Sequence, residues 1–379
     1  MAPRRKMKRK PVKVKKGVTR RKTKKKAKTK IRKDYEREYR EAMKKQGIAT
    51  ISRLSNDECI SNITGRISTR SLALDKVLRN QGEPSNWLGI PLSRVIEIFG
   101  PEHIGKSTIL DQLFAEVQSI GGEAFLADTE VSRDRYYTAN LGVDLNKLKY
   151  LEFEYDNRYI ENVLNAVVQT INIWAPANIP MVIGWDALGS TPTHDELEKG
   201  VAPQKSHQPG AAAKAMALAQ RLVVPKLAGT KISFVIINHE YDNINFSGFG
   251  KPKLTYGGHA TRHMASLRIQ LYSSGKWIKR SDGWIVGRTI VAKVLKNRVG
   301  EAMREAQIPM LTGQGTENMI TVLEDLKALG IITANRSWNA INIDGLELSF
   351  QGWNGLRAKC DEYPGLEDKL YKLHQKVVL

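Results

Sequence analysis

Cysteine is scarce in this chain of 379 residues, which holds only Cys59 and Cys360. So few thiols exclude a scaffold of several disulfides and the usual zinc clusters, and we expect inert cysteines in a reducing compartment. The sequence also lacks any run of about 18 uncharged apolar residues, so no transmembrane helix is expected. No apolar core follows the basic start, and we therefore expect no secretory signal. There is no visible internal repeat.

Acidic and aromatic residues are both missing from residues 1–33, which contain 19 Lys and Arg. The other 346 residues hold 41 basic and 39 acidic side chains, so most of the net charge of +21 lies in this segment. Its apolar content is too low to offset the entropy of ordering, which predicts a disordered basic tail. Such a tail favours salt-sensitive, sequence-independent binding to nucleic acid. A targeting or solubilising segment is the alternative, because KTKKKAKTK resembles a nuclear-import signal.

Hydrophobic patterning predicts an α/β fold with a mostly parallel central sheet flanked by helices. Expected strands cover 94–99, 123–128, 149–153, 180–185 and 231–237, and expected helices cover 34–46, 109–119, 134–141, 159–174 and 211–227. After about residue 264 the pattern changes to antiparallel strands over 267–272, 276–280 and 284–295, with a turn at 281–283. From residue 316 we expect a small α+β module.

The sequence GPEHIGKS over residues 100–107 fits the phosphate-binding pattern G-x-x-x-x-G-K-[ST], between a predicted strand and a predicted helix. Its glycines permit a tight loop whose N–H groups converge on phosphate oxygens, Lys106 supplies a charge, and the Ser107 hydroxyl can bind Mg²⁺. A chance glycine turn is the less favoured reading. The predicted nucleotide-binding residues here are Gly100, Pro101, Glu102, His103, Ile104, Gly105, Lys106, Ser107 and Thr108.

Acidic residues follow two of the other predicted strands. Asp186 follows strand 180–185 and is our candidate for the second Mg²⁺ ligand, beside Ser107. The alternative is that Asp186 is a simple turn residue. Glu130 and Asp128 lie at the end of another predicted strand. Either of them is a candidate for the base that orients water, and the alternative is that they are solvated loop acids. Because the carboxyl ends of parallel strands meet at one edge, we expect these side chains near the phosphate loop.

An ordered series of motifs now resembles the RecA-type recombinases, from about Ile67 to the end and most closely in their phage UvsX-like branch. The motifs are ISTRS with LALD, RVIEIFGPEHIGKST, DTE, DRYY, LGVD, MVIGWDALGSTPT, FVIINHE, FGKPKLTYGG, VLKNR and the C-terminal LGIIT…SWNAINIDGLELSFQGW. The resemblance implies a protomer-packing segment over 34–66, an ATPase core over 67–315 and a C-terminal module over 316–379. It also implies DNA loops near 191–210 and 240–258.

The resemblance assigns roles to individual residues. It makes Glu130 rather than Asp128 the general base, places Tyr137 against adenine and puts Asp134 near the base edge. His239 stands where bacterial members have a Gln that senses the γ-phosphate, and we expect it to couple nucleotide to DNA affinity. Lys296 and Arg298 match two cations that reach the neighbouring subunit's γ-phosphate, with Arg in place of the second Lys. The plainer alternatives are core packing for Tyr137, a satisfied buried histidine for His239, and a solvated strand end for Lys296 and Arg298.

Aromatic and basic residues in the two long loops fit single-strand binding by stacking and phosphate neutralisation. The resemblance, together with the shared helix face expected of Lys214 and Arg221, gives a set of DNA contacts. A solvated helix face is the alternative for that pair. The predicted DNA-binding residues are Lys205, Lys214, Arg221, Phe249, Lys251, Lys253, Gly257 and Gly258.

These features predict a DNA-dependent ATPase that uses ATP and Mg²⁺, forms a homo-oligomeric helical filament on single-stranded DNA and pairs it with duplex DNA. Single-strand-binding and mediator proteins would be accessory partners, and we expect no association with a membrane. The expected location is the cytoplasm of a bacterial or phage-infected cell. The rivals are a RecA-fold hexameric helicase or other motor, and a non-catalytic DNA-packaging protein.

Overall fold

The computed structural model describes residues 33–47, 49, 54–55, 59–199, 210–242 and 253–378. Its contacts divide the chain into two units, Met1–Cys59 and Ile60–Leu379. In the first unit, residues 33–45 form a helix close to the predicted range. Tyr35 and Tyr39 of this helix are exposed, and Arg40 pairs with Glu36 at 3.0 Å. The predicted tail and most of residues 48–54 lie outside the described residues.

The second unit is built around a ten-stranded sheet with the order β12-β11-β10-β9-β3-β7-β6-β4-β5, and β8 pairs with β7 off this path. The strands are β3 (Val95–Gly100), β4 (Glu123–Asp128), β5 (Leu148–Tyr150), β6 (Met181–Asp186), β7 (Ile232–Asp242), β8 (Lys253–Thr255), β9 (Leu267–Lys279), β10 (Ile285–Asn297), β11 (Glu305–Leu311) and β12 (Gly315–Thr316). Strands from β5 to β9 in this order run parallel, whereas β9 to β12 are antiparallel. The predicted α/β class with a mostly parallel sheet is confirmed.

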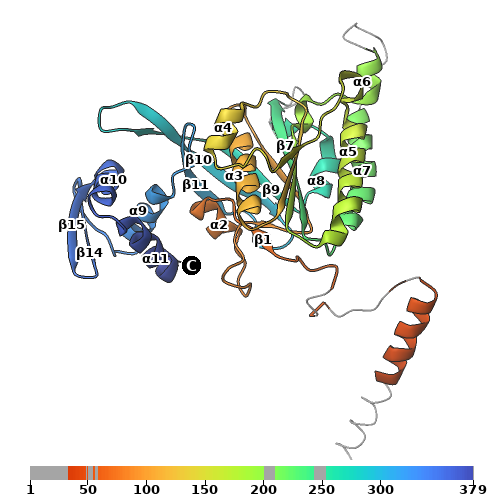
Figure 1. Ribbon diagram of the computed structural model, residues 1–379, viewed down its shortest axis with the longest axis horizontal. Coiled ribbons are helices and arrows are strands. Elements are labelled where there is room, and N and C mark those ends of the chain that lie inside the picture. Colours follow the sequence, from red (N-terminus) through yellow and green to blue (C-terminus); the bar gives the residue numbers. More distant parts are fainter. Residues whose placement is uncertain are drawn as a thin grey trace, which may run out of the picture. The chain divides into compact units, whose positions relative to one another are not determined.

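Helices cover both faces of the sheet (Figure 1). They are α2 (Leu72–Leu78), α3 (Lys106–Ser119), α4 (Arg135–Asn140), α5 (Ile160–Trp174), α7 (Ala211–Leu227) and α8 (Gly258–Met264). The short helix α6 (His194–Lys199) has no buried residue and lies beyond the ends of α5 and α7. The short elements β1 (Arg66–Ile67) and β2 (Ile90–Pro91) pair with each other, and 3-10 turns cover Tyr155–Asn157, Ala175–Ala177 and Leu188–Ser190.

Side chains of the parallel strands alternate between two apolar cores, as the pleat of a strand requires. Ile96 and Ile98 of β3 pack in the core that α2 and α3 share, whereas Val95 packs in the core of α5, α7 and α8. Burial on both faces explains the unbroken apolar runs of β6 and β7. The sheet's carboxyl-terminal edge is thereby fixed between two helical layers.

Three local predictions change in the structure. The strands expected at 267–272 and 276–280 are one strand, β9, whose pairing with β10 shifts register between Arg288 and Ile290. The helix expected from Ile109 begins at Lys106, because Gly105 adopts a left-handed φ of 99° directly before it. The first predicted DNA loop contains a short helix, α6.

The C-terminal part of the second unit has its own apolar core and a three-stranded antiparallel sheet. Its elements are α9 (Asn318–Ala328), β13 (Thr333–Asn335), β14 (Trp338–Ile343), β15 (Leu346–Gln351), α10 (Gly352–Glu362) and α11 (Leu366–Val378). Asn318 accepts a hydrogen bond from the backbone N–H of Leu72 at 2.9 Å, which ties α9 to α2. None of the described helices combines the length and apolar character that crossing a bilayer requires.

Candidate functional site

Four strand ends meet at one edge of the sheet. In the parallel register, Gly100 of β3 lies opposite His239 of β7, and Asp128 of β4 lies opposite Asp186 of β6. The loop between β3 and α3 lies beside this edge, as expected for a phosphate-binding loop. The structure therefore brings together the phosphate motif and the acidic residues singled out from the sequence.

These strand ends surround a cavity of about 710 Å³, a volume typical of small-molecule sites. Its lining includes most of the predicted nucleotide-binding residues and several that the sequence did not point to. The lining residues are Glu102, His103, Ile104, Gly105, Lys106, Ser107, Thr108, Glu130, Ser132, Tyr137, Asp186, Gly189, Ser190, His239, Glu240 and Tyr256. Of the predicted set, Gly100, Pro101 and Asp134 do not line it.

The side chain of Lys106 bonds to the backbone of its own loop. Its ammonium group donates to the carbonyl oxygens of Gly100 at 3.2 Å and Pro101 at 2.7 Å, and burial lowers its pKa. A Cβ atom on Gly100 would lie 2.3 Å from the Leu271 carbonyl oxygen, so the loop needs glycine there for its close approach to β9. These carbonyl partners satisfy the buried charge.

Ser107 and Asp186 form the predicted metal pair. Both residues line the cavity. Burial raises the pKa of Asp186, and Ser107 is among the groups that lower it by a smaller amount. Hydroxyl and carboxylate oxygens are the ligands that Mg²⁺ prefers, with nucleotide phosphates completing its shell. The residues present therefore fit a Mg²⁺–nucleotide complex.

Glu130 projects into the cavity from the loop after β4. Its Oε1 lies 2.6 Å from His239 Nε2 and accepts a hydrogen bond from Ser190 Oγ at 3.2 Å. The hydrogen bond with His239 is the main cause that lowers the pKa of Glu130, which keeps the carboxylate ionised near neutral pH. An ionised carboxylate in a half-buried cavity can orient and deprotonate a water molecule.

Asp128, the alternative base, has a different place. Its Oδ1 accepts hydrogen bonds from the backbone N–H groups of Glu130 at 3.1 Å and Val131 at 2.9 Å, and its Oδ2 accepts one from the Tyr150 hydroxyl at 3.0 Å. These donors occupy both carboxylate oxygens of Asp128, and Asp128 does not line the cavity. The geometry therefore favours Glu130 for the base, whereas Asp128 stabilises the turn that carries Glu130.

Of the two residues predicted around the adenine, Tyr137 lines the cavity and Asp134 does not. The Tyr137 hydroxyl lies 3.1 Å from Thr108 Oγ1 and its ring lines the cavity. Asp134 instead caps α4 by accepting a hydrogen bond from the Tyr137 N–H at 2.7 Å. Asp134 thus orients the helix that carries Tyr137, a capping role that its N-terminal position favours.

Lys296 and Arg298 are not brought to this cavity. The Lys296 ammonium group donates to the Arg262 carbonyl at 2.5 Å, and Arg298 lines a separate cavity with Arg94 and Val299. In the pairing of β10 with β9, Lys296 lies opposite Arg268, and Arg268 lies opposite Glu97 of β3. The backbone N–H of Arg298 donates to the carbonyl oxygen of Ser266. Arg298 therefore lies near the amino end of β3, and Lys296 lies level with Glu97, so both are displaced along the sheet from Gly100.

The described DNA-contact candidates gather around α7 and α8. Lys214 and Arg221 are exposed on α7, and Gly257, with a φ of 75°, precedes the first residue of α8. A Cβ on Gly258 would lie 3.4 Å from Ala213, so the glycine turn packs beside the start of α7. Lys253 is exposed at the start of β8.

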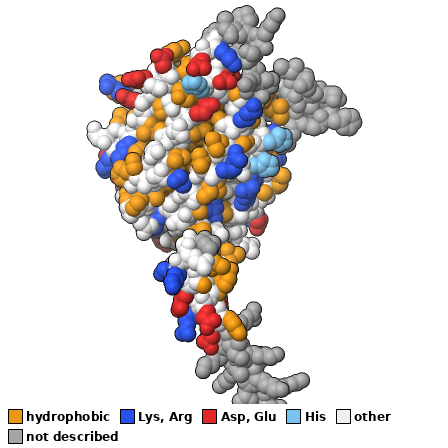
Figure 2. Space-filling view, turned by 90° about the vertical axis from the view of Figure 1, so that its right-hand side faces the viewer, with side chains coloured by type: hydrophobic (Ala, Val, Ile, Leu, Met, Phe, Trp, Pro, Cys, Tyr) orange, Lys and Arg blue, Asp and Glu red, His pale blue; other side chains and the backbone are white. Residues whose placement is uncertain are grey.

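Three further DNA candidates, Lys205, Phe249 and Lys251, lie outside the described residues. Figure 2 looks onto the side of the molecule where α5 and α7 lie in Figure 1, and it shows Lys and Arg side chains among hydrophobic ones, with histidines beside them. His259 and His263 of α8 are exposed and stack at 6.3 Å. This mixture of cations and rings suits a nucleic-acid strand.

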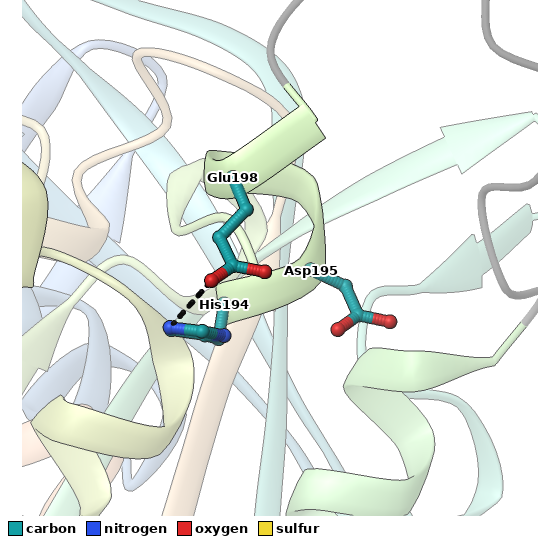
Figure 3. Close-up of side chains that lie close together, drawn as sticks. All are labelled: His194, Asp195 and Glu198. Carbon is teal, nitrogen blue, oxygen red and sulfur yellow. Dashed lines mark ion pairs between the residues drawn. The ribbon is translucent and has the colours of Figure 1, made fainter.

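A separate group of potential metal ligands lies on α6 (Figure 3). Atoms of His194, Asp195 and Glu198 lie within 4.8 Å of one another, but Asp195 points away from the other two, and the imidazole already lies 3.6 Å from Glu198. The group is partly or fully exposed and does not line the cavity. We place the metal at Ser107 and Asp186 instead.

Sequence reasoning missed Arg133, whose guanidinium contacts Asp111 of α3 and lies 2.8 Å from Asp186 Oδ2. An acidic residue on the apolar face of the helix after the phosphate loop was the available signal, because a buried carboxylate requires a partner. Gly189 was missed too: a Cβ there would lie 2.8 Å from the His239 ring and 3.0 Å from the Tyr256 ring.

Comparisons with known proteins identify similar sequences. The sequence profile of the RecA N-terminal domain matches residues 33–317. The Protein RecA of Sulfurimonas denitrificans is 30% identical over 313 residues, covering 82% of this chain and 83% of the relative. That of Delftia acidovorans is 30% identical over 323 residues (85% and 81%), and that of Cytophaga hutchinsonii is 30% identical over 337 residues (89% and 88%).

Proposed function

The chain belongs to the RecA family, and we propose that it is an ATP-dependent DNA strand-exchange recombinase that forms helical filaments on single-stranded DNA. It would pair the bound strand with a homologous duplex in recombination and repair, and base pairing would select the sequence. His239, in place of glutamine, supports the phage UvsX-like branch. We place its action in the cytoplasm, on DNA.

The placement of Lys296 and Arg298 carries this proposal. Along the sheet, Lys296 lies level with Glu97 and Arg298 lies near Val95, about three and five residues, or roughly 10 and 16 Å, from Gly100 of the phosphate loop. Lys106 is the one Lys or Arg among the described residues that line the cavity, which also holds four carboxylates. A head-to-tail neighbour can bring the missing cations to the phosphates, and head-to-tail contacts generate rings or open filaments.

The proposed hydrolysis follows from the geometry. Mg²⁺, when bound at Ser107 and Asp186, would neutralise phosphate charge. Lys106 leaves the carbonyls of Gly100 and Pro101 to bind phosphate, and Glu130 orients the attacking water. Lys296 and Arg298 of the next subunit stabilise charge on the transferred group, so nucleotide binding also joins subunits.

Mixing two inactive variants tests this arrangement. Lys106→Ala and Lys296→Ala proteins should each lose single-strand-stimulated ATP hydrolysis. Mixed in equal amounts they should regain activity at about a quarter of the interfaces, those with both groups intact. Lys293→Ala is the matched control on the same strand, where Lys293 pairs with Glu305 at 2.7 Å. No recovery in the mixture would contradict sites shared between subunits.

Two further measurements separate the rival functions. Hydrolysis that does not respond to single-stranded DNA would contradict a DNA-dependent ATPase, and no hydrolysis at all would favour the packaging protein. Electron microscopy with ATP and single-stranded DNA should show open helical filaments, whereas closed rings would favour a hexameric helicase.

We also propose that His239 couples the nucleotide to DNA affinity. It touches the base, Glu130, while the neighbouring Asn238 donates to the carbonyl oxygen of Tyr256 at 3.0 Å, beside the glycine turn. A change at the γ-phosphate that moves His239 therefore has a direct path to Gly257. His239→Ala should bind ATP but lose the ATP-dependent gain in DNA affinity. Retention of that gain would refute the coupling.

A further inference from the structure

Arg133 is a buried cation that joins helix α3 to the end of strand β6 beside the nucleotide site. It lies in the loop between β4 and α4, three residues after Glu130, and its side chain is 11% exposed. One arm of the guanidinium contacts Asp111 Oδ1, and the other lies 2.8 Å from Asp186 Oδ2. The two carboxylates are 3% and 6% exposed. These three side chains form a buried Asp–Arg–Asp bridge.

Asp111 has no other described role than to hold this bridge. It projects from the second turn of α3 away from the cavity lining, and its Oδ2 accepts a hydrogen bond from Thr138 Oγ1 at 3.1 Å. Asp128 also faces the guanidinium electrostatically. Two buried carboxylates thus hold Arg133, and the guanidinium cannot leave Asp186 without leaving a buried carboxylate unpaired, which would be costly.

Asp186 is therefore shared. Its carboxylate lies 2.8 Å from Arg133, and Asp186 lines the nucleotide cavity together with Ser107. A divalent cation that enters through Ser107 meets an acid whose charge is already partly balanced. In a poorly solvated site, a neighbouring positive charge weakens the binding of another cation.

We propose that Arg133 is a positioning residue and built-in counter-cation that sets how much Mg²⁺ this chain needs to bind nucleotide. Asp111 controls its strength by drawing the guanidinium away from Asp186. The bridge also fixes the loop that carries Glu130 and leads to Tyr137. This inference rests on the proposed Mg²⁺–ATP site, but not on DNA binding or strand exchange.

The two partners of Arg133 give variants with opposite effects. Asp111→Asn leaves the guanidinium to Asp186 alone, so the Mg²⁺ concentration for half-maximal nucleotide binding should rise. The double variant Asp111→Leu/Arg133→Leu removes the bridge without changing net charge, and it leaves Asp186 without its cation, so that Mg²⁺ can take the place of Arg133. Its Mg²⁺ requirement should fall, by roughly fivefold to tenfold. Arg133→Lys, which keeps the charge, should stay near the wild type.

The measurement is binding of a fluorescent ATP analogue, titrated with Mg²⁺ in the absence of DNA. Urea unfolding establishes that each variant is folded. The matched control is the double variant Arg70→Leu/Glu116→Leu, which removes another ion pair anchored on α3 (3.0 Å) whose residues do not line the cavity, and it should not change the Mg²⁺ requirement.

The order of the variants decides the proposal. A double variant that needs more Mg²⁺ than the wild type would show that Arg133 merely supports Asp186, and would overturn the proposal. An unchanged requirement in folded variants would overturn it as well. Nucleotide binding that ignores Mg²⁺ in every protein, including the wild type, would instead count against the proposed site. Failure of DNA-stimulated hydrolysis with the expected order would contradict the recombinase and leave this inference standing.

Discussion

Lys296 shows how a single residue's surroundings set its chemistry. Burial, with help from Arg298 and Arg268, lowers the pKa of its ammonium group to about 8. Below that pH the group is charged and can attract a neighbour's phosphate. Above it, the group is increasingly neutral, so the proposed contact between subunits weakens in the alkaline range.

Nucleotide-dependent assembly of the wild type should accordingly decline as the pH rises from 7 to 9. Lys296→Arg should remain assembled over this range, because a guanidinium stays protonated. Light scattering with a non-hydrolysed ATP analogue measures this. A wild-type profile that is flat, or an Arg variant with the same decline, would contradict the assignment.

Unfolding measured in parallel distinguishes lost assembly from lost structure. The pKa of Lys296 is lower in the folded protein than its ordinary value of 10.5. The unfolded chain therefore binds more protons between about pH 8 and 10.5, and this group makes the free energy of unfolding rise with pH there. Assembly and stability should thus change in opposite directions on account of Lys296.

At the scale of elements, the turn before α8 links the nucleotide site to the proposed DNA surface. Gly257 has a φ of 75°, and a Cβ there would lie 2.1 Å from Thr261 Oγ1. Gly275 of β9 has the same φ, but a Cβ there would meet nothing within 4 Å. These two glycines separate the effect of crowding from that of backbone strain.

Gly257→Ala should displace the first turn of α8 and lower single-strand affinity by about tenfold or more, since backbone contacts and Lys214 lose their alignment. Gly275→Ala should cost about 1 kcal/mol of stability through its φ alone. Fluorescence anisotropy of a labelled oligonucleotide measures affinity, and urea unfolding measures stability. Equal DNA affinity in the two variants would argue against a DNA role for this turn.

At the scale of the whole molecule, charge is divided between a basic segment and a nearly neutral remainder. Residues 1–33 hold 19 of the 60 Lys and Arg and no acid, and they lie almost wholly outside the described residues. The family profile begins at residue 33, so the basic segment precedes the part that the profile matches. We propose that it captures DNA without regard to sequence.

Deletion of residues 1–32 should weaken duplex binding and flatten its dependence on salt, because each neutralised phosphate contributes about 0.9 to the logarithmic slope. ATP binding should stay the same. The control is a tail of the same composition in scrambled order, which should behave like the wild type if charge alone acts. An unchanged slope after deletion would leave a targeting segment as the better interpretation.

The sequence by itself determined the features that depend on neighbouring residues. The phosphate loop lies within eight residues between a strand and a helix, and alternating apolar runs predicted the parallel sheet and its helices. A DNA-dependent role followed from charge and from the ordered motifs. The domain limits, the cofactors and the individual DNA contacts stay predictions.

Only the tertiary structure decided which distant groups share one site. Asp111, Arg133 and Asp186 come from three elements, and no local pattern joins them; the bridge exists because α3 and β6 pack on either side of one loop. The structure likewise favoured Glu130 over Asp128 by showing which carboxylate is left for the cavity. Lys296 lies level with Glu97, displaced along the sheet from the loop it is proposed to serve, and its ammonium group donates to the Arg262 carbonyl. This placement is the reason why we propose that a second subunit completes the site.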